Sequence, residues 1–313
     1  VAAQGSGLDS APALIAEARF LRAFYHFLLA QAWGDVPLRS KPTTSPSTSE
    51  VNIAATPQAD VLSWAATEIE SILPELSEEL TDTPPRVAQT TAAGILARIY
   101  LFMAGETVST TESKSELFQK AAHWADFVIQ SGKHQLNPDY SQVFINMISD
   151  KYDTEYRESM WEADFMGNRS SADQWSNGRI GDLIGLQSTS SQSNFSQWNC
   201  NYSYAQYNGS LKLWDLYWDN DRTDEEKQLS TITDKRQQWN LPEYNYKGGN
   251  VDGVSYVASI DKTPYIYNKV TTFTDPTTAV GIRNCGKWRR EAIYEGHQSA
   301  KNLYNQINFP ILR

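Results

Sequence analysis

The fold is decided by the stretch Glu17-Ala-Arg-Phe-Leu-Arg-Ala-Phe-Tyr-His-Phe-Leu-Leu-Ala-Gln-Ala-Trp-Gly-Asp-Val-Pro-Leu38. Its apolar residues recur at the three- and four-residue spacing of a helix and form two adjacent stripes. One stripe holds Phe20, Phe24, Phe27 and Gln31, and the next holds Leu21, Tyr25, Leu28 and Ala32. Because these stripes cover more than half of the circumference, we expect the helix to be packed from several sides. Gly34 can take the left-handed conformation that ends a helix, and Pro37 prevents its continuation.

The composition of the 313-residue chain limits its possible partners. Its formal net charge is −10 and its pI is about 5.0, which argues against nucleic acid and against an anionic membrane surface. No apolar run approaches the roughly 20 residues that a membrane-spanning helix needs. Ten Trp, sixteen Tyr and eleven Phe make the chain rich in aromatic residues, which suits a core and also suits a ligand surface.

Cysteine and histidine give no sign of a metal centre or a cofactor. Cys200 and Cys285 have no CxxC spacing, so a disulfide and two separate buried thiols are both open interpretations. The four histidines lack metal-ligand spacing, and His26 and His123 fall inside predicted helices. We expect these two to be packed or surface-facing rather than catalytic.

Both ends of the chain predict that it is an internal segment of a longer protein. The first residue, Val1, is not an initiator Met, and no signal peptide precedes the first helix. The apolar segment Phe309-Pro-Ile-Leu-Arg313 stops where another element is expected to begin.

Three more helices are predicted before residue 133. Residues 38–52 are rich in Ser, Thr and Pro, and we expect an irregular surface connection there. Thr56-Pro57 is predicted to open the second helix, with Thr56 as its N-cap. Residues 87–104 and 117–131 form the third and fourth helices, and Gly132 ends the last one.

Small and aromatic residues on the later helices predict how the helices pair. The Leu96-Ala97-x-x-Tyr100 spacing is typical of the first helix of a tetratricopeptide hairpin, and Ala121 and Ala125 suit the helix that packs against it. We therefore predict two helical hairpins over residues 12–132, each with an irregular loop between its helices.

The sequence changes character after Gly132. A turn and short helix are predicted near residues 137–145, a strand near 158–165, and short strands broken by Gly248-Gly249 between 244 and 286. Residues 167–208 show almost no periodicity, and so long a loop is unusual unless it has a function. The prediction is a mainly α fold, with tetratricopeptide-like hairpins over residues 1–135. An irregular, loop-rich, partly β ligand-binding portion follows over residues 136–313.

The loop-rich portion carries aromatic rings beside amide side chains, a combination that suits sugars. A flat ring covers the C–H face of a pyranose, and Asn and Gln reach its hydroxyls. Covering a sugar face with one ring contributes roughly 2 kcal/mol by area. The predicted stacking residues are Trp175, Trp198, Tyr202, Tyr204 and Tyr207, with Asn199 and Asn201 on hydroxyls.

Ordinary packing is the alternative interpretation of these aromatic residues. It is the one we adopt for Trp214, Tyr217 and Trp218, because they have helical spacing. Catalysis is not predicted: no GxSxG elbow, phosphate-binding glycine loop or outstanding carboxylate pair is present.

Several motifs resemble the SusD/RagB family. They are the Arg19-Phe-Leu-Arg-Ala-Phe-Tyr-His-Phe27 helix with its Trp33-Gly-Asp-Val-Pro-Leu38 exit, Ala92–Leu101, Ala122–Gly132, Glu158-Ser-Met-Trp-Glu162, Asp219-Asn-Asp-Arg222, Gly286-Lys-Trp288 and Asn308–Arg313. This resemblance spans essentially the whole chain.

The resemblance implies a non-catalytic glycan-capture lipoprotein on the outer surface of the outer membrane. Its implied partners are an oligosaccharide or polysaccharide and a SusC-like TonB-dependent transporter, and its lipid would be carried by an N-terminal part that this chain lacks. The implied ligand region is about residues 175–207, just before the Asp219 turn. A helical protein–protein scaffold without sugar binding and a glycoside hydrolase are the alternatives.

Overall fold

The computed structural model describes residues 11–81, 86–148 and 151–165, together with ten short segments of the remaining chain. These segments are 183–185, 206–207, 209–210, 212–213, 216–217, 234–241, 245–251, 254–261, 285–288 and 309–313. The chain divides into two compact units. Unit 1 comprises residues 1–135, 156–161 and 310–313, and unit 2 comprises residues 136–155 and 162–309.

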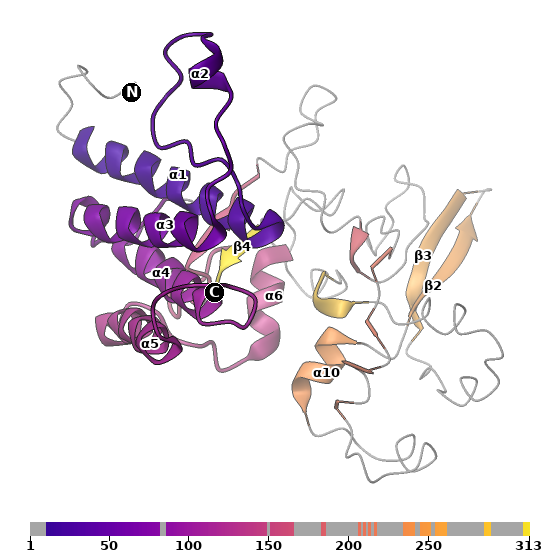
Figure 1. Ribbon diagram of the computed structural model, residues 1–313. Helices are drawn as coiled ribbons and strands as arrows, with labels where there is room; N and C mark the ends of the chain where they lie inside the picture. The colour runs from indigo at the N-terminus through magenta and orange to yellow at the C-terminus, as the bar shows by residue number, and fades with distance from the viewer. Residues whose placement is uncertain are drawn as a thin grey trace. The chain divides into compact units, whose positions relative to one another are not determined.

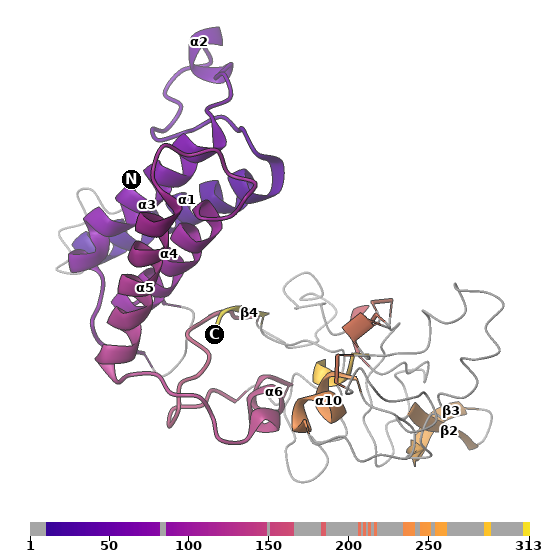
Figure 2. The same ribbon diagram turned by 60° about the horizontal axis from the view of Figure 1, so that its bottom comes forward.

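Unit 1 is built from two helical hairpins. Helices α1 (Ala11–Trp33) and α3 (Gln58–Ile72) pack against each other, and so do α4 (Gln89–Met103) and α5 (Lys114–Ser131). Helix α3 also contacts α4, so the four helices lie side by side, as Figures 1 and 2 show. The predicted mainly α fold with tetratricopeptide-like hairpins is confirmed.

The residues that follow α1 also cap the start of α3. Gly34 has φ +74°, and its N–H donates to the Ala30 carbonyl at 2.9 Å, which confirms the predicted left-handed stop. Val36 and Thr56 then exchange backbone hydrogen bonds of 3.2 and 3.0 Å. This bridge lets the Asp35 carboxylate accept from the N–H of Gln58, the first residue of α3, at 2.8 Å. The predicted Thr56 cap is therefore wrong: Pro57 occupies the N-cap position, and Asp35 supplies the acceptor.

Helix α1 buries one stripe and exposes the other. Phe20, Phe24 and Phe27 are buried among the helices, and the Trp161 ring lies edge-on to Phe20 and Phe24, with centroids 5.3 and 5.0 Å away. Solvent reaches the opposite face, where Tyr25, Leu28, Leu29 and Trp33 are exposed. The expectation that α1 is packed from several sides holds in part. Trp161 and the Phe102 ring of α4 contact its phenylalanines, and α3 contacts Arg19, Arg22 and His26, whereas the remaining face is exposed.

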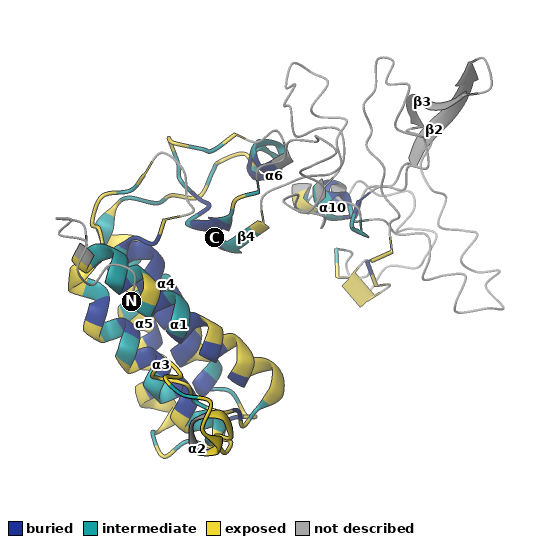
Figure 3. Cartoon of the chain, turned by 90° about the horizontal axis from the view of Figure 1, so that it is seen from above, coloured by how far each residue is buried: buried dark blue, intermediate teal, exposed yellow. Residues whose placement is uncertain are grey.

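The connection after α1 is exposed along most of its length, as the yellow loop beside α2 in Figure 3 shows. One short helix, α2 (Thr48–Val51), interrupts this otherwise irregular segment, whereas the Ser/Thr/Pro composition predicted no regular structure there. Helices α3 and α5 end in common ways. A short 3₁₀ turn, Leu73–Glu75, follows α3. Helix α5 begins with a Ser113/Glu116 capping box and ends at Gly132, with φ +63°.

Two segments far apart in sequence meet on α4. Strand β1 (Trp161–Ala163) pairs with β4 (Phe309–Leu312), and the Met160 N–H donates to the Leu312 carbonyl at 2.9 Å. Gly94 of α4 allows this close approach, since a Cβ there would lie 2.6 Å from the Leu312 side chain. The chain thus leaves unit 1 after Trp161 and re-enters it at Pro310, where β1 and β4 pair.

Unit 2 contains shorter elements. Those in the described part of unit 2 include α6 (Tyr140–Ile148), α10 (Lys235–Asn240), a 3₁₀ turn η4 (Gly286–Trp288), and the antiparallel strands β2 (Asn245–Val251) and β3 (Val254–Asp261). The Gly248-Gly249 pair lies inside β2 instead of breaking it, and the strand register shifts between Lys247 and Gly248. Phe144, Met147 and Trp239 form the buried apolar cluster of this unit. Cys285 is a free, half-buried thiol, which decides against a Cys200–Cys285 disulfide.

Candidate functional site

The predicted sugar-stacking group is represented in the structure by Tyr207. Its side chain is 58% exposed, and its backbone N–H donates to the Leu183 carbonyl at 3.2 Å. An exposed ring on a backbone held by a hydrogen bond is suitable for stacking against a sugar. The other six predicted residues, Trp175, Trp198, Asn199, Asn201, Tyr202 and Tyr204, lie outside the described residues.

The segment that carries Tyr207 is fixed to the end of α10. Gly209 is buried, and a Cβ at that position would collide with the Leu241 side chain, so any other residue there would displace Leu241. Leu241, at the C-cap of α10, is itself 1% exposed and is held by the Gln237 side chain, whose amide donates to the Leu241 carbonyl at 2.9 Å. Tyr207 is therefore presented two residues from a tightly packed anchor.

An amide joins two tyrosines beside this anchor. The Tyr140 hydroxyl of α6 donates to the Asn240 side-chain oxygen at 2.8 Å. The Asn240 amide nitrogen in turn donates to the Tyr217 hydroxyl at 2.5 Å. Both tyrosines are half-buried, and Tyr140 also packs edge-on against Phe144, with centroids 5.1 Å apart. Tyr217 thus has a specific polar partner, which helical spacing alone did not reveal.

The other end of α10 is closed by an ion pair. The Asp234 carboxylate accepts from the Arg236 backbone N–H at 2.9 Å and from its guanidinium at 2.7 Å. Hydrogen bonding from Arg236 lowers the pKa of Asp234 below its ordinary value. The Arg236 charge is therefore matched locally, and Tyr207, Tyr217 and Asn240 at the opposite end of the helix define the candidate site.

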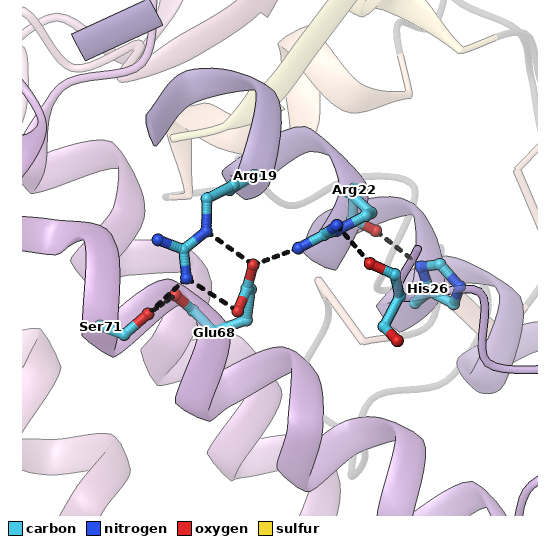
Figure 4. A network of polar contacts seen from close by, with 6 residues as sticks. Arg19, Arg22, His26, Glu68 and Ser71 are labelled. Atoms are coloured by element: carbon cyan, nitrogen blue, oxygen red, sulfur yellow. Dashed lines mark hydrogen bonds and ion pairs between the residues drawn. The ribbon is translucent and has the colours of Figure 1, made fainter. Parts of the chain in front are cut away.

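A network of charged side chains in unit 1 holds helices α1 and α3 together. Arg19 of α1 binds Glu68 of α3 with both ends of its guanidinium, at 2.8 and 3.0 Å, and Arg22 forms a second ion pair with the same carboxylate. Figure 4 shows both arginines converging on Glu68. These hydrogen bonds, with that from Arg19 the largest cause, lower the pKa of Glu68. Both arginines of the helix motif are therefore bound to Glu68 and stabilise the packing of α1 against α3.

His26 belongs to the same network. Its Nε2 accepts the Arg39 backbone N–H at 3.1 Å, so Nδ1 carries the proton and donates to the Arg22 carbonyl at 2.8 Å. The ring is buried and lies edge-on to Trp64, with centroids 5.2 Å apart. His26 is thus packed, as predicted, and its ring fixes the chain that leaves α1.

Metal ligands and membrane spans were also sought among the described residues. Within that part of the chain, no three His, Cys, Asp or Glu side chains gather as a metal site would require. No helix found there combines the length and the apolarity needed to cross a membrane.

The fold consists of helical hairpins in unit 1 and a second unit whose residues run between the two paired strands β1 and β4. Residues 5–101 match the model of the SusD-like family described as "Starch-binding associating with outer membrane". This match bears out the SusD/RagB resemblance for residues 5–101, and the fold of the whole chain agrees with it.

Solved structures share this fold across nearly all of the chain. Surface glycan-binding protein A from Bacteroides uniformis has a TM-score of 0.60 at 16% identity, over 99% of this chain and 54% of its own. A structure with a xylogluco-oligosaccharide gives 0.56 at 19% identity, over 100% and 54%. A laminarin-binding SusD-like protein gives 0.54 at 17% identity, over 96% and 64%.

The chain spans only about half the length of the solved structures it matches. It covers 51% of one matching chain and 54% of another. No curated protein matches it in sequence. The likeness therefore establishes the fold and leaves the ligand to be argued from this chain's own residues.

Proposed function

We propose that this protein captures an oligosaccharide or polysaccharide without chemically changing it. The observation that carries the proposal is the SusD-like fold of the whole chain, combined with a starch-binding family match over residues 5–101. Three related structures are described as glycan-binding, as containing a xylogluco-oligosaccharide, or as laminarin-binding. An exposed Tyr207 on an anchored segment supports the same reading in this chain.

The predicted site would work by stacking and hydrogen bonding. Trp175, Trp198, Tyr202, Tyr204 and Tyr207 would cover sugar faces, and Asn199 and Asn201 would bind hydroxyls. At roughly 2 kcal/mol for each covered face, several rings are needed, because association also costs translational and rotational freedom. We therefore propose modest affinity at each site, strengthened by many copies displayed on one surface.

Delivery and location form the finer part of the proposal. We propose that the protein is lipid-anchored on the outer surface of the outer membrane and passes its glycan to a SusC-like TonB-dependent transporter. The family description links its members with the outer membrane, which supports this location. Co-purification of a TonB-dependent transporter with the lipidated protein from outer membranes tests it, and recovery of the protein alone would contradict it.

Calorimetry tests glycan capture directly. The 313-residue chain is titrated with a starch oligosaccharide, a xyloglucan oligosaccharide and laminarin, which represent the three ligands named among its relatives. We expect at least one to bind, and Trp198→Ala to weaken that binding several-fold. Binding of none would oppose the proposal, whereas unchanged binding by Trp198→Ala would remove only Trp198 from the site.

A reducing-sugar assay on the same samples separates capture from hydrolysis. We expect the amount of reducing ends to stay at the level of a protein-free control. Release of new reducing ends would instead favour a glycoside hydrolase.

A further inference from the structure

Resting on the glycan capture proposed above, we propose that Tyr217 is a second ligand-contacting residue of the site. Its hydroxyl donates a hydrogen bond to a sugar oxygen. Sequence spacing assigned this residue to ordinary packing. The geometry of its hydroxyl, and the position of its neighbours on α10, give it a different role.

The hydrogen bonds around Asn240 decide which proton is available. A side-chain amide offers one oxygen and one nitrogen, and here the oxygen accepts from Tyr140 while the nitrogen donates to Tyr217. The Tyr140 hydroxyl hydrogen is therefore already engaged in the hydrogen bond to Asn240. The Tyr217 hydroxyl receives a hydrogen bond, so its own proton remains to be given to another acceptor. A hydroxyl that accepts one hydrogen bond is also polarised to donate a stronger one.

The surroundings of Tyr217 place this donor near solvent. The preceding residue, Leu216, is 69% exposed, and the Tyr217 side chain is half-buried. A fully buried hydroxyl would need a protein acceptor, whereas a half-buried one can serve a ligand that displaces water. Tyr217 is thus held by Asn240 while part of its side chain stays accessible.

The end of α10 connects this donor to the exposed ring of Tyr207. Asn240 holds Tyr217, and the next residue, Leu241, packs against Gly209, two residues beyond Tyr207. Two consecutive residues therefore anchor a stacking ring and a hydroxyl donor that come from different segments. A ring for the apolar sugar face together with a fixed donor for a hydroxyl or ring oxygen is the pairing that carbohydrate recognition requires.

The amide offers a matched pair of substitutions. Tyr217→Phe removes the hydroxyl that accepts from Asn240, and Tyr140→Phe removes the hydroxyl that donates to Asn240. Each substitution deletes one oxygen and keeps the ring. The probes are the starch oligosaccharide, the xyloglucan oligosaccharide and laminarin, titrated calorimetrically into each 313-residue protein. Loss of one hydrogen bond to the sugar should weaken binding about tenfold in Tyr217→Phe. Tyr140→Phe should lower the melting temperature and leave affinity within about twofold, because its hydroxyl serves the fold.

Resonances of the tyrosine rings provide a measurement that needs no variant. On titration of the wild-type protein with the probe that binds, the Tyr217 ring carbons should shift while those of Tyr140 stay in place. This readout also decides the matter if Tyr217→Phe does not fold.

The outcomes separate this inference from the proposed function. Wild-type affinity in Tyr217→Phe, or an equal loss of affinity in both variants, overturns the role of Tyr217 while glycan capture stands. Failure of the wild-type protein to bind any of the three probes overturns glycan capture, and the role of Tyr217 with it.

Discussion

At the scale of single residues, the charged side chains of the motif helix serve the frame. Glu68 accepts hydrogen bonds from Arg19 and Arg22, and Arg19 also donates to the Ser71 hydroxyl at 3.0 Å. Only 13% of the Glu68 side chain is exposed, so its charge depends on these partners. Spacing alone placed both arginines on the helix and left their acceptor unnamed, because that acceptor lies 46 and 49 positions away on α3.

Replacing Glu68 by Gln is expected to lower the free energy of unfolding by about 2–3 kcal/mol, since hydrogen bonds to charged groups are stronger than neutral ones and both arginines are only about a third exposed. Because the pKa of Glu68 is lowered on folding, the pair stabilises the protein above the unfolded value of 4.5, and this contribution is lost as pH falls through the folded pKa. Urea unfolding at several pH values measures both effects.

The control for this substitution is Glu17→Gln. Glu17 pairs with Arg86, whose side chain is 52% exposed, so about 0.5 kcal/mol is expected. Equal effects of the two substitutions would contradict the assigned importance of Glu68.

A second titrating residue, His134, fastens residues 156–161 to α4. Its Nδ1–H donates to the Arg157 carbonyl at 2.7 Å, and Nε2 accepts from the Thr90 hydroxyl at 2.9 Å. Burial, the largest cause, lowers the pKa of His134 below 6.5, and the positive charges of Arg157 and Lys133 act in the same direction. Arg157 has φ +52°, an uncommon conformation for a residue with a side chain, and the His134 bond helps to hold it.

The free energy of unfolding should therefore decrease on acidification, because His134 takes up a proton more readily in the unfolded chain. The unfolded chain takes up the proton near pH 6.5, and the folded chain does so only at lower pH. Stability is thus complete above 6.5 and declines as pH drops toward the folded pKa. We expect His134→Gln to lower stability at pH 8 and to flatten the slope below pH 6.5 in thermal unfolding. His123→Gln, at an exposed position of α5, is the control, and an unaltered slope in His134→Gln would argue against this assignment.

At the scale of elements, α1 shows how one helix can carry two unlike apolar faces. Phe27 is 1% exposed and contacts the Phe102 ring of α4, with centroids 6.1 Å apart. Its neighbour Leu28 is 36% exposed and lies on the outer face with Leu29 and Trp33. The helical period predicts both stripes equally, and only the positions of α3 and α4 decide which one is buried.

Adjacent alanine substitutions on α1 should therefore differ sharply. Phe27→Ala is expected to cost about 3–5 kcal/mol through lost burial and the cavity left behind, whereas Leu28→Ala should cost less than about 1 kcal/mol. Chemical denaturation of both variants measures the difference. A large cost at Leu28 would show that this face is covered in the folded chain.

At the scale of the whole molecule, unit 1 is completed by the last residues of the chain. The Arg98 guanidinium donates to the Ile311 carbonyl at 2.8 Å, and Arg313 pairs with the buried Glu158 carboxylate at 2.9 Å. Leu312 is buried against Gly94 of α4. Residues on either side of the inserted segment thus depend on one another for their burial.

Leu312→Ala should destabilise unit 1 by about 2–3 kcal/mol, since it opens a cavity against α4. Phe309→Ala, on the same strand but 42% exposed, should cost less than about 1 kcal/mol. Amide hydrogen exchange of α4 in both variants checks the prediction. Equal protection of α4 in Leu312→Ala and wild type would mean that the returning strand contributes little to the frame.

The amino-acid sequence by itself determined the local elements: the span of α1, its glycine stop, the glycine end of α5 and the pairing of helices into hairpins. These follow from periodicity and from backbone preferences that each residue carries with it. It did not determine which stripe of α1 is buried, that Asp35 rather than Thr56 completes the start of α3, or that Asn240 joins Tyr140 to Tyr217. Those outcomes depend on which distant groups meet, and burial and hydrogen bonding between distant groups exist only once the chain has folded.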